Sequence, residues 1–460
     1  MAIATVNPYT NEVMKTFQES TPKSVEQALE TAAAEYRQWR TTSYPERAAV
    51  LHRVAVILRR RRSELAKLIT IEMGKLVAES AAEIDLSADI FDYYADHGEG
   101  FLADERVVTK RGEAFLRHSP IGVVLGVEPW NFPFYQVARF AAPNVMVGNV
   151  VLVKHASNVP QCAIAIEEIF REAGAPTGLY TNLLISGSRA SALVADERIQ
   201  GAALTGSEAA GSSFAAAAGK NMKKSVLELG GSDPFIVLED ADIDQAVEWA
   251  FVGRMNNTGQ CCVAAKRLIV VEPVADEFIR KFVARMSNLK VGNPLDPSTQ
   301  LGPVSSEAAA VELEGQVQRA VEAGAKVLLG GKRIAGKGAF LEATVLTDVP
   351  PGSPISHEEM FGPVAVIYRV PDENAAIRLA NDSPFGLGGS VFTSDVERGK
   401  RVADRIDTGM VFINHPTWTA PELPFGGVKR SGYGRELSSL GIEEFVNKKL
   451  IRVSSLSDPF

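Results

Sequence analysis

Cysteine is rare in this chain of 460 residues, which contains only Cys162, Cys261 and Cys262. Three cysteines are too few for a disulfide framework, and they lack the spacing of a zinc site. The six histidines show no metal-ligand spacing either, so the sequence predicts no bound metal. Cys162 lies in an apolar stretch of helical character and is expected in the core.

Long apolar runs are also missing. No segment reaches the roughly 18 consecutive apolar residues that cross a bilayer. The first residues, Met1–Asn7, have neither the basic start nor the apolar run of a signal peptide. The formal net charge of −8 disfavours broad attraction to nucleic acid. These absences predict a cytoplasmic protein that binds neither membranes nor nucleic acid.

Two common phosphate-binding signatures are absent. The motif Gly-x-Gly-x-x-Gly does not occur, and Gly331–Lys337 fails as a P-loop because Gly338 stands where Ser or Thr would bind magnesium. A nucleotide site must therefore use another feature. The turn Thr205-Gly206-Ser207 leads from an apolar strand into an Ala-rich helix, so its free N–H groups and the helix dipole would suit a pyrophosphate.

The residue pattern changes along the chain. The first hundred residues have helical spacing, with Ser24 as the expected start of one helix and a second helical segment over 45–72. Short β-prone pieces follow over 107–124. From Val150 onward strands alternate with helices, which predicts a parallel, doubly wound α/β sheet. A second α/β stretch extends over about 267–414.

Several polar residues occupy positions suited to chemistry. Cys261 and Cys262 stand at a boundary between polar and apolar residues, where a thiol can be partly exposed and activated. Glu228 closes a strand and is a candidate general base. Asn131 lies between two prolines and offers a rigid amide to an oxyanion. Lys154 ends an apolar strand and could hold a ribose or phosphate. A buried cysteine pair and a salt-bridged carboxylate are equally good explanations on these residues alone.

Together these residues resemble the aldehyde dehydrogenase superfamily, over nearly the whole chain. The markers occur in the family's order and are Pro129-Trp130-Asn131-Phe132-Pro133, Lys154, Thr205-Gly206-Ser207 with Gly211, Glu228-Leu229-Gly230-Gly231, Gly259-Gln260-Cys261-Cys262, Glu358-Glu359-Met360-Phe361-Gly362-Pro363 and Pro424-Phe425-Gly426-Gly427. The resemblance implies an α/β fold with a Rossmann-type cofactor domain, an α/β catalytic domain and a small β oligomerisation element.

The resemblance also implies a role for each marker. Cys262 would attack the aldehyde carbon, and the Asn131 side chain and the Cys262 backbone N–H would hold the oxyanion of the thiohemiacetal. After hydride transfer, Glu228 would activate the water that hydrolyses the thioester. The residues implied to bind the cofactor are Trp130, Lys154, Ser157, Gly206, Ser207, Gly211, Glu359 and Phe361.

Ser157 bears on the choice of cofactor. Many members of the family have Glu three residues after the strand-end lysine, where it accepts hydrogen bonds from the adenosine ribose and would repel the 2′-phosphate of NADP. Ser157 is small, neutral and a donor, and Lys154 adds a cation. The resemblance therefore implies that NADP is preferred, with NAD possible.

The sequence defines the substrate less closely than the reaction. Arg139 lies about two helical turns beyond Asn131 and would bind the carboxylate of a short aldehyde acid; a structural ion pair is the alternative. The loop 414–421 is expected to line the substrate mouth with Trp418 and Thr419, which keeps uncharged aliphatic or aromatic aldehydes open. Similarity is greatest to bacterial succinate-semialdehyde dehydrogenases, over the stretches Pro129–Phe140, Lys154–Pro160 and Glu228–Pro234.

Other classes explain less. A non-catalytic relative is disfavoured because all three catalytic residue types are present, and a CoA-acylating enzyme because Glu228 can activate water. A cysteine hydrolase using His357 or His415 would leave the other markers unexplained. Cys261 is expected as a passive neighbour of Cys262 rather than as its partner in a vicinal disulfide.

The resemblance also divides the chain. The expected parts are a cofactor-binding domain over 1–106 and 125–231, a catalytic domain over 232–413, and an oligomerisation element over 107–124 and 440–460. Because this element pairs subunits in the family, a homodimer or homotetramer is expected. The short tail after the strand near Leu450–Val453 makes the tetramer the less favoured of the two.

Overall fold

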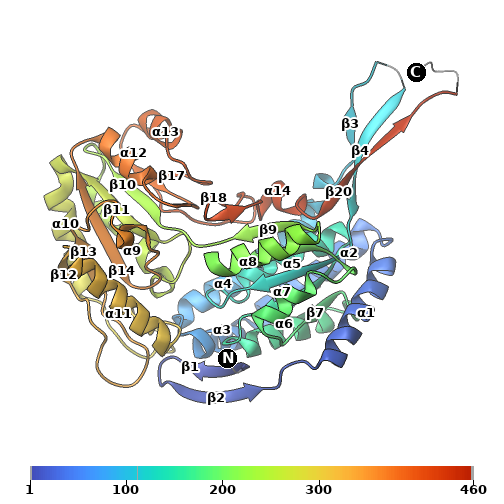
Figure 1. The fold of residues 1–460 in the computed structure, drawn as a ribbon, viewed down its shortest axis with the longest axis horizontal. Helices are drawn as coiled ribbons and strands as arrows, with labels where there is room; N and C mark the ends of the chain where they lie inside the picture. Colours follow the sequence, from blue (N-terminus) through green and yellow to red (C-terminus); the bar gives the residue numbers. More distant parts are fainter. Residues whose placement is uncertain (1–2, 111, 457–460) are drawn as a thin grey trace.

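Two α/β bodies and one protruding β arm make up the structure, a computed structural model that describes residues 3–110 and 112–456 (Figure 1). The arm extends away from both bodies and contains β3 (Glu105–Val107), β4 (Glu113–Pro120) and β20 (Val446–Val453). The predicted α/β fold is confirmed. None of the helices among the described residues has the length and apolar character needed to span a membrane.

The first body is built on one mixed sheet. Its strands are β5 (Val123–Glu128), β6 (Val150–His155), β7 (Tyr180–Asn182), β8 (Ile199–Thr205), β9 (Lys224–Glu228) and β19 (Gly432–Tyr433). They follow the order β19-β9-β8-β5-β6-β7, and every neighbouring pair except β19 with β9 is parallel. The prediction of a parallel sheet from alternating strands and helices is therefore confirmed.

Helices surround this sheet. They are α1 (Pro22–Trp39), α2 (Tyr44–Arg60), α3 (Arg62–Met73), α4 (Val77–Phe101), α5 (Tyr135–Val147), α6 (Pro160–Glu172), α7 (Gly187–Leu193), α8 (Glu208–Lys220) and α14 (Ser438–Ile442). The prediction of Ser24 as the first cap is wrong, because Thr21 caps α1 by accepting the Ser24 N–H at 3.1 Å. The segment 45–72 is two helices, which meet at Arg61. A hairpin of β1 (Ile3–Asn7) and β2 (Glu12–Phe17) precedes them.

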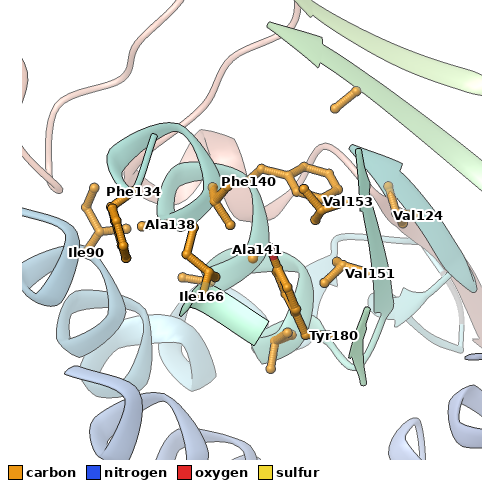
Figure 2. Close-up of a cluster of buried hydrophobic side chains, with 14 of the residues drawn as sticks. Ile90, Val124, Phe134, Ala138, Phe140, Ala141, Val151, Val153, Ile166 and Tyr180 are labelled. Atoms are coloured by element: carbon orange, nitrogen blue, oxygen red, sulfur yellow. The ribbon is translucent and has the colours of Figure 1, made fainter. Parts of the chain in front are cut away.

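The core of the first body lies around α5. Every residue of α5 is buried, which is typical of a helix enclosed by protein on all sides. In Figure 2 its side chains Ala138 and Ala141 lie among residues of neighbouring helices and of the sheet. Gly126 permits this close packing, because a Cβ there would lie 2.5 Å from the Phe140 ring. Cys162 is fully buried in the same cluster, as predicted.

The second body has its own parallel sheet. Its strands are β10 (Asp233–Val237), β11 (Ala265–Val271), β12 (Lys326–Leu329), β13 (Thr344–Thr347), β14 (Val364–Val370), β16 (Ser390–Phe392) and β17 (Phe412–Ile413), in the order β12-β13-β14-β11-β10-β16-β17. Only the β12 pairing is antiparallel. The other elements are α9 (Ile243–Met255), α10 (Glu272–Ser287), α11 (Glu307–Glu322), α12 (Glu373–Asn381), α13 (Val396–Ala403), the 3₁₀ helices η1 (Asn256–Gly259) and η2 (Pro354–His357), and the small strands β15 (Phe385–Gly386) and β18 (Val428–Lys429).

The arm joins segments that are far apart in the chain. Strand β20 pairs with β4 along its whole length, from Val446 beside Pro120 to Val453 beside Glu113, and β3 pairs with the other edge of β4. Strand β5 starts at Val123, so the end of the range 107–124 belongs to the first sheet. Residues 1–2, 111 and 457–460 of the expected domains lie outside the described residues.

A buried ion pair links Lys75, just before α4, to Glu83 on α4, and the carboxylate of Glu83 also binds the start of α5. The side chains of Lys75 and Glu83 are fully buried and contact each other directly. The second carboxylate oxygen of Glu83 accepts the N–H groups of Phe134 at 2.8 Å and Tyr135 at 3.2 Å. These N–H groups belong to the first turn of α5 and have no partner within the helix. Glu83 therefore fixes both the lysine and the helix start.

We predict that Glu83→Ala lowers the free energy of unfolding by about 3–5 kcal/mol, because it leaves the buried Lys75 ammonium unpaired. The midpoint of urea unfolding, followed by circular dichroism, measures the change. Asp96→Ala is the control on the same helix: Asp96 is 57% exposed beside His52, so its loss should cost less than about 1 kcal/mol. Equal shifts for both variants would contradict the assignment.

Candidate active site

The carboxyl ends of the first sheet's strands lie along one edge. The strand register sets Glu128 beside His155, and Thr205 beside Glu228. Ligands of α/β proteins bind at this edge of a parallel sheet. The cysteine segment, which follows α9 of the second body, meets this edge.

A strained turn leads into the cysteine pair. Asn257 has φ 55° and Thr258 φ 54°, a left-handed conformation that is uncommon for a β-branched residue. Such positions cost about 1–3 kcal/mol and persist only where the surroundings impose them. The buried Arg254 does so here, because its guanidinium donates to the carbonyl of Gly259, at 3.4 Å, and to that of Val364, at 2.7 Å.

The loop that carries Asn131 is held against this turn. Asn131 Nδ2 donates to the Gln260 carbonyl at 3.2 Å, and the Asn131 carbonyl accepts from Asn257 Nδ2 at 2.8 Å. His155 Nε2 contacts the Pro133 carbonyl at 2.8 Å. Burial lowers the pKa of His155 to about 4, so its ring is neutral and donates through Nε2. One N–H of the Asn131 amide stays available beside the cysteines.

Lys266 of β11 organises the cysteine backbone and was not predicted. Its ammonium donates to the carbonyls of Cys261 at 2.8 Å and Cys262 at 2.7 Å, and pairs with Glu359 at 2.9 Å. It lies 5.6 Å from the centre of the Phe361 ring. The sequence does carry a signal for it, because a lysine within a buried apolar strand requires partners.

Two glycines bring separate motifs together. A Cβ at Gly230 would lie 2.4 Å from a Glu359 carboxylate oxygen, and one at Gly231 would lie 2.7 Å from the Cys262 carbonyl oxygen. The Gly231 N–H donates to Glu359 at 3.0 Å. Both glycines are therefore needed for close approach, which explains their place after the Glu228 strand.

The Cys262 thiol is half-buried and its pKa is raised. The contact with the Cys261 side chain is the largest cause and burial the next, while the charges of Arg139 and Lys266 act in the opposite direction. Cys261 is buried. At neutral pH the resting form of Cys262 is the thiol, so a base has to take its proton before it can attack.

Glu228 is a buried carboxyl behind the cysteine segment. Burial raises its pKa well above the ordinary value, while the charge of Arg139 opposes the shift. Neither carboxyl oxygen has a hydrogen-bond partner among the described residues. Gly426 makes room for this group, since a Cβ there would lie 2.8 Å from Glu228 Oε1. Burial thus favours the protonated form of Glu228, which can accept a proton only in its ionised form.

A cavity of about 650 Å³ opens at Cys262. It runs between α4, the start of α5, α9 and the loop 414–421. Trp418 and Thr419 line it, and Trp418 is 41% exposed. Among the described residues of its lining there is no lysine, arginine or histidine. Its lining contains the aromatic residues Phe132, Tyr135, Phe251, Trp418 and Phe425 with Thr419, and also the carboxylates of Glu79, Glu83, Asp85 and Asp89.

Arg139 does not reach this cavity, so its predicted contact with the substrate is not supported by the geometry. Its side chain is fully buried and pairs with Glu436, and its guanidinium lies 4.5 Å from the centre of the Phe425 ring. The ion pair that the sequence left open is present. Arg139 acts on the cavity through Tyr135, whose hydroxyl oxygen accepts from it at 3.2 Å.

Tyr135 is a polar residue of the cavity wall for which the sequence predicted no role. Its hydroxyl lies 2.9 Å from Thr419 Oγ1. Burial raises the pKa of Tyr135 to about 12, so the hydroxyl keeps its proton at neutral pH. Since the oxygen accepts from Arg139, its hydrogen is free to point towards Thr419 or a ligand.

Lys154 and Ser157, which are expected to bind the cofactor, lie at the end of β6 and in the loop that follows it. Lys154 is the penultimate residue of β6; its ammonium makes no ion pair or hydrogen bond with any described residue, and burial lowers its pKa. Ser157 follows in the loop before α6. A buried cation without a carboxylate partner fits an anionic ligand. Trp130 and Phe361 lie edge to face, with ring centres 5.8 Å apart, beside Lys266.

The turn before α8 has the geometry of an anion site. Ser207 caps α8 by accepting the Ala210 N–H, and the Gly206 N–H donates to the Glu228 carbonyl at 3.0 Å. Gly211 serves packing instead, because a Cβ there would lie 2.5 Å from Leu229. The remaining N–H groups of the first helical turn and the dipole of α8 face the edge.

The first body offers the N-terminus of α8 at the edge of a parallel sheet, and the second body places its cysteine segment against that edge. This arrangement defines a nucleotide-dependent α/β enzyme with a thiol at its centre. The chain belongs to the aldehyde dehydrogenase family, whose family model matches residues 1–451. It is 54% identical over 449 residues to a succinate-semialdehyde dehydrogenase (NADP+) of Deinococcus radiodurans, covering 98% of this chain and 94% of that protein.

Further relatives are similar along their full length. A probable succinate-semialdehyde dehydrogenase (NADP+) of Synechocystis is 48% identical, with 99% of this chain and 100% of that protein covered. Among solved structures, the succinic semialdehyde dehydrogenase of Streptococcus pyogenes in complex with NADP+ has a TM-score of 0.97 at 46% identity, covering 99% of this chain and 100% of that chain. The predicted family is therefore confirmed.

We predict that the rate at which iodoacetamide modifies Cys262 rises by about tenfold per pH unit from pH 7 to pH 9, because a raised pKa keeps the thiolate scarce. Peptide mapping by mass spectrometry separates Cys262 from Cys261. Free cysteine is the control and levels off near its pKa of about 8.5. Cys261→Ala removes the largest cause of the shift and should speed the reaction at pH 8. A plateau already at pH 8 in the unaltered protein would contradict the prediction.

Proposed function

We propose that this protein oxidises succinic semialdehyde to succinate, with NADP as the preferred hydride acceptor. One observation carries the proposal: the half-buried Cys262 thiol opens into a cavity of about 650 Å³ at the carboxyl edge of a nucleotide-type sheet. The relatives named above, at 46–54% identity, support this substrate and this cofactor.

The proposed chemistry begins when the Cys262 thiol gives its proton to water in the cavity, which leaves the thiolate. Its sulfur attacks the aldehyde carbon, and the oxyanion of the resulting thiohemiacetal accepts from the free N–H of the Asn131 amide and from the Cys262 backbone N–H. Bound NADP supplies the acceptor for the hydride. The thioester left on Cys262 is then hydrolysed by a water whose proton passes to Glu228. Loss of one oxyanion donor would cost about 3 kcal/mol, or a hundredfold in rate.

The cofactor would be held by residues that fit its charges. The Lys154 ammonium and the Ser157 hydroxyl would meet the adenosine ribose and its 2′-phosphate. Gly206, Ser207 and Trp130 would meet the pyrophosphate, with Gly211 supporting α8 from behind. On the nicotinamide side, Glu359 would meet the ribose, and Phe361 the ring. Lys266 fixes that end of the site, because it pairs with Glu359.

The substrate carboxylate would be bound by neutral donors. The hydroxyls of Tyr135 and Thr419 face the cavity, and Arg139 behind them raises their donor strength without entering it. A hydrogen bond from a neutral group to a carboxylate is shorter and stronger than a neutral pair. The apolar wall formed by Trp418, Phe132 and Phe251 favours a second candidate, the oxidation of uncharged aliphatic or aromatic aldehydes.

The protein would act as a cytoplasmic homodimer or homotetramer through its β arm. Leu450 and Val453 of β20 are 60% and 54% exposed, and exposed apolar residues on an open sheet favour pairing with another copy. In the domain division proposed with this, the first sheet and its helices bind the cofactor. The second body carries the thiol, and the arm joins subunits.

The proposal predicts that kcat/KM for succinic semialdehyde with NADP exceeds that for hexanal or benzaldehyde by at least about 100-fold, because a site built around hydroxyl donors rejects an aldehyde that leaves them unpaired. Initial rates of reduced-cofactor formation, with each aldehyde against NADP and NAD, measure this. A preference for the uncharged aldehydes would replace the substrate assignment with the second candidate.

In the same assay, Ser157→Glu should lower kcat/KM for NADP by more than about tenfold, since the new carboxylate repels the 2′-phosphate, and should change that for NAD little. Ser157→Ala is the matched control and should affect the two cofactors alike. Equal losses for both cofactors in Ser157→Glu would mean that the ribose site lies elsewhere.

Glu228→Gln should stop the reaction after hydride transfer. We expect a burst of about one reduced cofactor per active site, followed by a steady rate at least about 100-fold lower. Since burial raises the pKa of Glu228, the steady rate of the unaltered protein should rise with pH until that group is ionised, and the variant should lose this rise. Stopped-flow absorbance records both phases. Cys262→Ala should show no burst, and full steady activity of Glu228→Gln would refute the role.

A further inference from the structure

The root of the arm holds a histidine and two carboxylates from three separate elements. His118 is on β4, Glu105 is on β3, and Glu443 stands at the end of α14, just before β20. One possible ligand atom from each residue lies within 4.8 Å of the others. None of the three lines the cavity at Cys262.

The strand register explains how they meet. Glu105 is paired with Leu116, which lies two residues before His118 on the same strand. Residues two apart in a strand point to the same face, and diagonal neighbours on adjacent strands are within reach of long side chains. Lys448 of β20 stands directly opposite His118, so Glu443, five residues earlier, enters from the open end of the sheet.

His118 is the residue of this cluster whose buried polar atoms point to a missing ligand. It is 6% exposed, and neither ring nitrogen makes a hydrogen bond with any described residue. Its Nε2 is aimed at the carboxylate of Glu105, 3.3 Å from Oε1. Buried polar groups are normally hydrogen-bonded, and an exception points to an ion, a water or a functional role.

We propose that Glu105, His118 and Glu443 bind a divalent transition-metal cation of the zinc type. Imidazole together with carboxylates suits zinc, and the two carboxylates balance its charge. Bonds of about 2.0–2.2 Å in tetrahedral geometry separate two ligands by about 3.3–3.6 Å, which matches the spacing of His118 and Glu105. Three protein ligands leave the fourth position to water.

Lys448 competes with the cation. Its ammonium donates to Glu443 Oε2 at 2.6 Å, and the side chain is 43% exposed, so it can turn into solvent when the cation binds. Glu105 is 55% exposed and gives the cation a path from solvent. The bound ion would tie β3 and β4 to the chain that leads into β20, and so stiffen the arm where it leaves the body.

The test uses the full chain with Cys261→Ser and Cys262→Ser, because thiolates bind zinc themselves. Protein treated with EDTA and gel-filtered is titrated with ZnCl2 in a calorimeter. We expect one zinc per chain and a rise in Tm of about 2–4 °C at saturating zinc. Absence of binding in this background would overturn the proposal.

Four variants in the same background locate the site. His118→Gln and Glu105→Gln should each weaken zinc affinity by more than about tenfold, because each removes a direct ligand. Lys448→Ala should strengthen it, since the competing ammonium is gone. Glu113→Gln is the matched control: this exposed carboxylate is on β4 but on the opposite face, and its loss should change nothing.

Glu105→Gln keeps the test decisive if His118→Gln fails to fold, because Glu105 is a surface residue. Cobalt gives a second readout: the visible absorption of bound Co²⁺ should appear with the unaltered site and be lost in Glu105→Gln. Affinity that is unchanged in both ligand variants, or equally reduced in Glu113→Gln, would refute the site. Neither result would alter the proposed oxidation at Cys262.

Discussion

The Lys266 ammonium links the cysteine segment to Glu359 beside the reacting thiol of Cys262. Its contacts with two successive carbonyls fix the cysteine backbone, and its ion pair orients Glu359, which in turn accepts the Gly231 N–H at 3.0 Å. Three of the family's sequence motifs therefore converge on one buried cation. The strain at Thr258 is maintained by the contacts of the surrounding turn, among them that of Arg254 with the Gly259 carbonyl.

Near Lys266 there is a shortage of positive charge, because buried carboxyl groups outnumber the cations that could neutralise them. Glu128, Glu228 and Glu436 are buried around the single guanidinium of Arg139, and burial raises the pKa of each. The charge of Arg139 and, at Glu228, that of Arg435 oppose the rise in pKa without cancelling it, so the protonated forms of these carboxyls are favoured. The same shortage explains why Arg139 is unavailable to a substrate and why hydroxyl groups face the cavity instead.

The sequence predicted the features that depend on local pattern. The alternation of strands and helices gave the parallel sheet, and the motifs with their order gave the family. It could not reveal the partner of Arg139, because Glu436 reaches it from the far end of the chain. It also gave no sign of the cluster of Glu105, His118 and Glu443, whose members meet only through the register of the arm. The prediction of no bound metal used only the spacing of cysteines and histidines along the chain. The N-terminal hairpin was missed because it is too short for a clear period.

The C-terminal segment packs against the first body. The first body therefore cannot finish folding until the ribosome has made that segment. Asn149 Nδ2 donates to the carbonyl of Phe445, 296 positions further along the chain, at 2.8 Å, and β19 and β20 close the edges of β9 and β4. At about 5–20 residues per second, a ribosome needs roughly 15–60 s to supply that segment. During this time two strand edges of the nascent chain stay open to other chains, so crowding on a polysome is the condition under which this fold is most exposed to mispairing.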